Sequence, residues 1–142
     1  MNNNLEITNI EELKKIAQGQ VVEIIGFSGE ENDYFKLKLK RPSLLNLVGS
    51  GSIPNELLNA AHIVFFGAKT PKDVVSMKEY SNLYKTIAKA AMVEPSYEEL
   101  ENVGLELTDE QLIEIFNYTQ RGVKSLVSFR EKQRCAQDNK SK

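Results

Sequence analysis

The feature that most constrains the fold is residues 34–40 (YFKLKLK), which alternate strictly between apolar and basic side chains. Successive side chains of a strand point to opposite faces, so this run predicts a strand with one apolar face and one charged face. Residues 21–27 (VVEIIGF) are rich in β-branched side chains and predict a second strand. A loop containing Gly29 joins the two runs. Together they predict a β-hairpin with one buried and one solvated face.

The lysines of this hairpin permit three interpretations: a nucleic-acid contact, a solvated sheet face, or an edge strand that charge protects against aggregation. The basic residues concerned are Lys36, Lys38, Lys40 and Arg41. The net charge of the chain is -2, and no aromatic side chain lies among the lysines on their face. Both facts argue against a dedicated nucleic-acid binder, so we expect no specific nucleic-acid partner.

Most of the remaining chain shows helical patterns. Thr8 or Asn9 caps a first helix at residues 10–18, and about five helices follow the hairpin. These helices are predicted at residues 44–48, 54–66, 71–92, 97–103 and from 109 onward. The predicted fold class is therefore α+β and predominantly helical, with one globular domain at residues 1–132 and a polar, disordered tail at 133–142.

Several of these helices have recognisable ends. Thr70 with Pro71 is expected to start the helix at 71–92. Ser96 with Glu99 and Thr108 with Gln111 each predict a capping box. Gly122 falls inside the predicted last helix, where glycine costs about 1 kcal/mol relative to alanine. We therefore expect close packing or a kink at Gly122.

No residue pattern predicts catalysis, a cofactor or a metal site. His62 is the only histidine and has no cysteine beside it, so a structural position on a mostly buried helix is expected. Cys135 is the only cysteine and lacks a positioned base. The turn at residues 49–52 (GSGS) lacks the Lys-Ser/Thr of a phosphate loop. We therefore predict a non-enzymatic protein.

The location is expected to be intracellular. One cysteine cannot form a disulfide within the chain, which is typical of a reducing compartment. The first residues (MNNNLEITN) lack the pattern of a signal peptide, and the most apolar stretch, residues 60–68, is too short to span a bilayer. These features predict a soluble protein without a membrane partner.

Acidic residues dominate the chain between Lys89 and Arg121, where there is no Lys or Arg. The carboxylates are Glu94, Glu98, Glu99, Glu101, Glu106, Asp109, Glu110 and Glu114. One interpretation is a solvated acidic surface. The other is a surface that pairs with the basic strand of a second copy, giving a homo-oligomer. The candidate residues for self-association are Lys36, Lys38, Lys40, Arg41, Glu98, Glu99 and Glu101.

Three stretches resemble the tail assembly chaperones of long-tailed phages and PBSX-like prophages. The first is residues 41–44 (RPSL) after a charged strand, the Gly/Ser turn at 49–52, and residues 53–58 (IPNELL). The second is residues 93–99 (VEPSYEE), an acidic Pro-Ser helix start. The third is the helix that begins at residues 107–112 (LTDEQL). The likeness covers residues 34–130.

This resemblance implies a non-enzymatic function in the host bacterial cytoplasm. Such chaperones bind the apolar, helical tape measure protein and keep it soluble until tail tube protein polymerises around it. A longer form made by translational frameshifting is a further partner that the resemblance implies. The open alternatives are a structural tail component retained in the particle and a nucleic-acid-binding accessory protein that uses residues 36–41.

A chaperone of this kind needs apolar grooves between short helices. The candidate partner-binding residues are Leu44, Leu45, Leu47, Ile53, Leu57, Leu58 and Phe65. The turn at residues 49–52 is a hinge that would let the first of these helices move as a lip. The alternative is that these side chains form part of the core.

Overall fold

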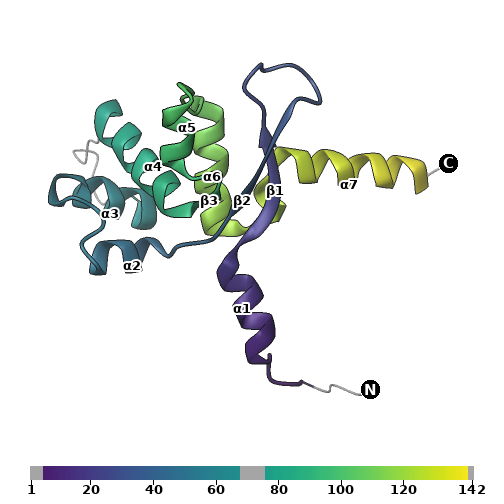
Figure 1. Cartoon of the computed structure of the whole chain (residues 1–142), viewed down its shortest axis with the longest axis horizontal. Helices are drawn as coiled ribbons and strands as arrows, with labels where there is room; N and C mark the ends of the chain where they lie inside the picture. The colour runs from purple at the N-terminus through teal and green to yellow at the C-terminus, as the bar shows by residue number, and fades with distance from the viewer. Residues whose placement is uncertain (1–4, 68–75, 141–142) are drawn as a thin grey trace.

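The computed structural model describes residues 5–67 and 76–140 and has an α+β fold that is predominantly helical (Figure 1). The helices are α1 (Ile10–Gln18), α2 (Leu44–Gly49), α3 (Leu58–Phe66), α4 (Met77–Ala91), α5 (Tyr97–Asn102), α6 (Asp109–Arg121) and α7 (Val127–Lys140). The strands are β1 (Gln20–Ile25), β2 (Tyr34–Leu39) and β3 (Met92–Glu94). Two 3₁₀ turns, η1 (Asn55–Leu57) and η2 (Val123–Ser125), precede α3 and α7. Within these described residues, no helix combines the length and the apolar character needed to cross a bilayer.

The predicted hairpin is confirmed, and a third strand extends it. β2 lies in the middle of the sheet, antiparallel to β1 on one side and to β3 on the other. The register places Lys36 opposite Glu23 and Lys38 opposite Glu94, so these lysines face carboxylates on neighbouring strands. β3 pairs only with Lys38 and Leu39, so residues 34–37 of β2 have a strand partner on the β1 side alone. The interpretation that the lysines protect an edge stays a prediction. The sequence pattern does not predict β3, because three residues are too few to show alternation.

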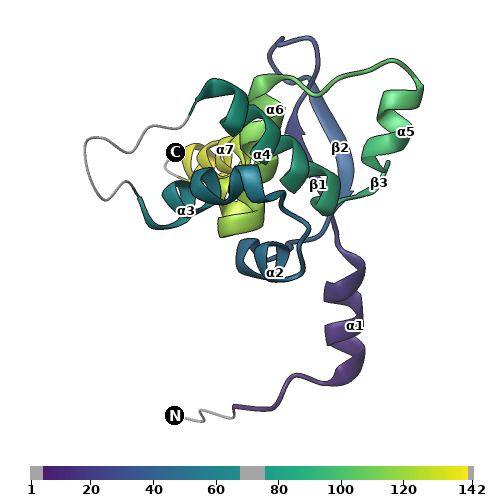
Figure 2. The same ribbon diagram turned by 90° about the vertical axis from the view of Figure 1, so that its left-hand side faces the viewer.

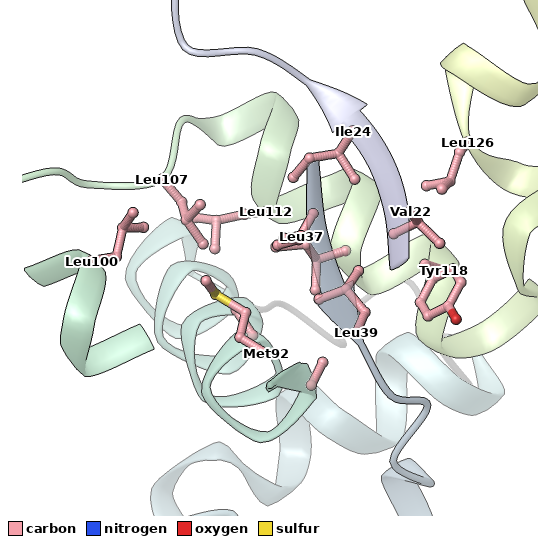
Figure 3. Close-up of a cluster of buried hydrophobic side chains, with 13 residues drawn as sticks. Val22, Ile24, Leu37, Leu39, Met92, Leu100, Leu107, Leu112, Tyr118 and Leu126 are labelled. Atoms are coloured by element: carbon pink, nitrogen blue, oxygen red, sulfur yellow. The ribbon is translucent and has the colours of Figure 1, made fainter. Parts of the chain in front are cut away.

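The core consists of two neighbouring clusters that share α4. Figure 3 shows the larger cluster, in which the apolar face of the hairpin packs against α5, α6 and the start of α7. Its sheet residues are Val22, Ile24, Leu37 and Leu39. The smaller cluster joins α2, η1 and α3 to α4 through Leu83 and Ile87. The larger cluster takes Ala88 and Ala91 from α4, so this helix connects the two halves of the core.

Helix starts follow the predicted capping chemistry at Asn9, Ser96 and Thr108. The capping boxes Ser96–Glu99 and Thr108–Gln111 are both present. α4 begins at Met77, where Ser76 and Glu79 form a third capping box. The described helix therefore begins at Met77, and the predicted start at Thr70 and Pro71 lies outside the described residues.

The predicted last helix is divided into α6 and α7. Gly122 ends α6 with φ 81° and ψ -165°, and η2 turns the chain before α7 begins. The expectation of one helix with a kink is corrected to two helices, because this backbone conformation cannot continue a helix. α7 runs past residue 133 to Lys140 and extends away from the body, where the composition alone predicted a disordered tail (Figure 1).

Replacing Gly122 with alanine is expected to lower the free energy of unfolding by about 1–3 kcal/mol, because a side chain is strained in this region of backbone space. The added Cβ would also lie 3.3 Å from Nη1 of Arg41. Denaturant unfolding monitored by circular dichroism measures the loss. Gly49→Ala is the control, because Gly49 has an ordinary φ and no heavy atom within 4 Å of the added Cβ. Equal losses at both positions would contradict the prediction.

Candidate interaction surface

The most exposed apolar surface lies at the N-terminal end of the described chain. Five side chains form what we call the N-terminal apolar stripe: Leu5, Ile7, Ile10, Leu13 and Ile16. Their exposed fractions are 96% for Leu5 and Ile7, 63% for Ile10, 46% for Leu13 and 69% for Ile16. Burying a side chain of this size stabilises a protein by about 1.5–3 kcal/mol. The isolated chain lacks most of this stabilisation at all five positions. Exposed apolar surface of this kind is typical of an interaction site, which makes the stripe a candidate.

Local chemistry explains why α1 is helical although it buries none of its residues. The Asn9 side chain accepts a hydrogen bond of 2.8 Å from the backbone N–H of Glu12, which caps the helix. Glu11 and Glu12 occupy the first turn, where the helix dipole favours negative charge. Gly19, with φ 97°, ends the helix and leads into β1. Figures 1 and 2 show α1 projecting from the body, attached to it at this end.

A groove of about 860 Å³ lies where α1, the end of β2 and α2 meet. Figure 2 shows these elements on the same side of the molecule. The large apolar and aromatic side chains along it are Ile16, Leu39, Pro42, Leu47 and Tyr118. Its charged lining residues are all basic: Lys15, Lys40 and Arg41. The groove therefore combines an apolar floor with a positively charged rim.

The inner wall of the groove is fixed by Tyr118 and Arg41. The Tyr118 hydroxyl donates a hydrogen bond of 3.0 Å to Oε1 of Gln20, and burial raises the pKa of this tyrosine while the Arg41 charge opposes the rise. Arg41 donates from Nε to the carbonyl of Thr119 (3.3 Å) and from Nη2 to that of Gln120 (3.0 Å). These carbonyls end α6, so Arg41 caps that helix.

The candidate partner-binding residues separate into core and surface. Leu44, Ile53 and Leu57 are buried in the smaller core cluster. Leu47 packs against that cluster and lines the groove. The exposed members are Leu45, Leu58 and Phe65. The structure therefore places only part of the predicted site where a partner can reach it.

The Gly/Ser turn is closed by hydrogen bonds. The backbone N–H of Ser52 donates to the carbonyl of Leu47 at 2.9 Å, and that of Gly51 donates to Val48 at 3.2 Å. The hydroxyls of Ser50 and Ser52 lie 2.9 Å apart and share a hydrogen bond. Ile53, directly after the turn, is buried. In this structure the segment is a defined turn that seats α2 on the core.

The charged candidates for self-association have different environments. Lys36 and Lys40 are exposed, and Lys38 is half-buried beside Glu94. Glu99 accepts a hydrogen bond of 3.0 Å from the backbone of Ser96, so it serves the capping box of α5. The other acidic candidates, Glu98 and Glu101, are exposed on α5. Figures 1 and 2 show α5 in the upper part of the molecule and α1 and α2, whose residues line the groove, in the lower part.

Two polar side chains of α6 have roles that the sequence did not reveal. Glu114 was grouped with the acidic surface, but it is 5% exposed, and Gln111 is fully buried. Oε1 of Glu114 accepts a hydrogen bond of 3.2 Å from the N–H of Ile25, and Nε2 of Gln111 donates one of 2.9 Å to the carbonyl of the same residue. Glu114 also accepts from the N–H of Val127 at 3.4 Å. The pair therefore joins α6 to the outer edge of β1 and to the start of α7.

The residues considered for catalysis are dispersed. His62 is exposed rather than buried, with its ring centroid 4.9 Å from that of Phe66, which corrects the expected structural position. Cys135 is exposed on α7. In the described part of the chain, no group of three or more His, Cys, Asp or Glu side chains is arranged to hold a metal ion.

Comparison of the chain with protein-family models, with curated proteins and with solved structures found no match.

Proposed function

We propose that this chain is a non-enzymatic tail assembly chaperone of a phage or prophage. It binds the tape measure protein in the host bacterial cytoplasm and keeps it soluble until tail tube protein assembles around it. A longer, frameshifted form of the chain would act beside it. The resemblance at residues 41–58, 93–99 and 107–130 suggests this family.

The observation that carries the proposal is the N-terminal apolar stripe. A helical partner with an apolar face is held by a second helix that presents side chains at three- and four-residue spacing. Ile10, Leu13 and Ile16 repeat at three-residue spacing on α1 and are exposed. The apolar floor of the adjoining groove continues this surface towards α2. Together they offer a helical tape measure segment a surface that leaves the core of the chaperone undisturbed.

Replacing Ile10 and Leu13 with aspartate is expected to abolish the solubilisation of co-expressed tape measure protein. Each of these side chains contributes about 1.5–3 kcal/mol when buried, and about 1.4 kcal/mol corresponds to a tenfold change in affinity. Because both side chains are lost, binding should weaken by at least about a hundredfold. The soluble fraction of the tape measure protein and its co-purification with the chain measure the effect.

The matched control is Met77→Asp, which alters an exposed apolar residue at the start of α4 and should leave solubilisation intact. The thermal midpoint of the α1 variant should equal that of wild type, because α1 buries none of its residues. Full solubilisation by a folded α1 variant would contradict the proposed site. Mass spectrometry of purified particles distinguishes a chaperone, which is absent, from a structural tail component, which is present.

A further inference from the structure

The outer edge of β2 is open over residues 34–37, and we propose that this open β2 edge receives an extended, acidic segment of another protein. β3 pairs only with Lys38 and Leu39 on this side of β2. After Glu94 the chain meets Pro95, which has no N–H, and turns into α5. Figure 2 shows β2 running on from β3 towards the hairpin loop. Among the described residues, 34–37 therefore lack the second strand partner that Lys38 and Leu39 have.

The register decides which backbone groups point outward along this edge. On β1, both backbone groups of Ile25 bond to side chains of α6, and the carbonyl of Glu23 bonds to a side chain of α7, so these groups point away from β2. Tyr34 and Lys36 are the register partners of these two residues, so their N–H and C=O groups point away from β1. The N–H of Lys40 follows the same alternation and donates to the last carbonyl of α4 at 2.9 Å. Four backbone groups therefore line the open β2 edge.

These four groups have no backbone partner in the described chain. Lys36 is exposed and Tyr34 is half-buried, so the edge is accessible from solvent. Free donors and acceptors at a sheet edge bind an extended segment of another chain through the same hydrogen bonds that hold a sheet together. The backbone bonds supply the affinity, and the side chains beside them decide which sequence binds.

The side chains on the solvated face of this edge favour carboxylates. β3 already places Glu94 opposite Lys38, and a further strand in line with β3 would place its own residue opposite Lys36. Glu23 is the β1 partner of Lys36, but its carboxylate is paired with Lys132 at 2.7 Å. Lys36 takes part in none of the ion pairs of the described chain. A carboxylate opposite Lys36 stabilises the pair, whereas the lysine of a second β2 would be repelled.

The side chains on the other face of the edge favour apolar neighbours. Leu37 is buried in the larger core cluster. Phe35 packs against that cluster from a half-buried position, with its ring centroid 5.1 Å from that of Phe27. Every second side chain of an added strand would lie on this face. The occupant that fits is therefore an extended segment in which acidic and apolar side chains alternate.

This inference goes beyond the proposed function and does not rest on it. The tape measure protein is proposed to bind α1 as a helix, whereas the open β2 edge binds an extended chain. A synthetic peptide tests the edge without any tape measure protein, so the two proposals can fail independently.

A titration followed by nuclear magnetic resonance, with a capped peptide of alternating valine and glutamate about six residues long, tests the proposal. The amide resonances of Tyr34 and Lys36 are expected to shift, and their hydrogen exchange should slow, because both N–H groups gain an acceptor. A peptide of alternating valine and lysine should bind at least about tenfold more weakly, because it places like charges opposite Lys36 and Lys38. At about 1 M salt the difference between the two peptides should shrink.

Methylation of the peptide backbone separates strand addition from simple attraction of charge. In an antiparallel addition the glutamates lie opposite Tyr34 and Lys36 and exchange hydrogen bonds with them, while the valine N–H groups point away. N-methylation of the glutamates should therefore abolish binding, and the peptide N-methylated at the valines should still bind. Equal loss with both methylated peptides would overturn the proposal.

Charge reversal in the protein gives the matching test. Lys36→Glu should lose the valine–glutamate peptide and bind the valine–lysine peptide instead. Lys85→Glu changes the net charge equally at an exposed position of α4 and should keep the preference of wild type. An unchanged preference in folded Lys36→Glu, or the absence of shifts at Tyr34 and Lys36, would overturn the proposal. Shifts at these two amides on concentrating wild type without peptide would also overturn it, because a second copy would then occupy the edge.

Discussion

Replacing Gln111 with alanine is expected to lower the free energy of unfolding by about 2–4 kcal/mol, the sum of a lost helix cap and a buried carbonyl left without a donor. Gln111 is fully buried. Its Oε1 accepts a hydrogen bond of 2.9 Å from the N–H of Thr108, and its Nε2 donates one of 2.9 Å to the carbonyl of Ile25. One side chain thus starts α6 and fixes that helix to β1. Urea unfolding at neutral pH measures the loss.

The control for Gln111 is Glu99→Ala, which removes the equivalent residue from the exposed capping box of α5. Only the capping contribution is lost there, typically about 1 kcal/mol. Gln111→Glu keeps an acceptor for the N–H of Thr108 but places a carboxylate against the carbonyl of Ile25. The stability of this variant should therefore rise as the pH falls, because the protonated carboxyl can donate to that carbonyl. A Gln111→Ala loss no larger than that of Glu99→Ala would show that the bond to β1 contributes little.

Replacing Glu114 with alanine is expected to cost about 1–3 kcal/mol, because the N–H of Ile25 loses its acceptor inside the protein. The weaker bond to Val127, at 3.4 Å, is lost as well. In this variant α7 should detach from the body more readily than in wild type, and amide hydrogen exchange at residues 127–131 should therefore be faster. Glu110→Ala is the control, because Glu110 is exposed on the same helix. Similar losses at the two positions would contradict the structural role of Glu114.

Glu114 should also make stability depend on pH. Burial raises the pKa of its carboxyl above 4.5, against the opposing effect of the Ile25 and Val127 N–H groups and of Arg130, while Glu110 adds to the rise. In the unfolded chain the proton leaves near 4.5, so the folded chain binds more protons just above that pH. The stabilising contribution of protonated Glu114 to the free energy of unfolding is therefore fully present below pH 4.5. It is lost as the pH rises through the pKa that Glu114 has in the folded chain. Glutamine at this position cannot titrate, so Glu114→Gln should flatten the plot of unfolding free energy against pH in this range. Parallel plots for the variant and wild type would contradict the prediction.

Local chemistry was sufficient to predict much of the fold. The alternation at residues 34–40 and the β-branched run before it predict the hairpin, and the capping boxes at Ser96 and Thr108 predict the starts of α5 and α6. The failures have physical causes. β3 owes its strand conformation to pairing with β2 rather than to its own pattern. Gly122 carried a helix-breaking signal, but the apolar spacing continued through it and masked the break.

The candidate site was predictable only in part, because burial depends on what the tertiary fold brings together. Leu44 and Leu45 are neighbours with the same side chain, yet one is in the core and the other is exposed. Glu114 looked like any surface carboxylate until the outer edge of β1 was placed beside it. The signal for the N-terminal apolar stripe was present, since Ile10, Leu13 and Ile16 share a face. Only the structure shows that nothing in the described chain buries that face.

The closed edge of β1 has a consequence for how this protein can assemble. A sheet with free backbone groups at its edge can gain a strand from another chain. Here side chains of α6 and α7 hold both backbone groups of Ile25 and the carbonyl of Glu23. At the other edge, β3 is three residues long and is followed by Pro95, which has no N–H to donate. Strand addition is thus disfavoured at these positions of β1 and at β3, while the apolar side chains of α1 stay exposed and accessible to another chain.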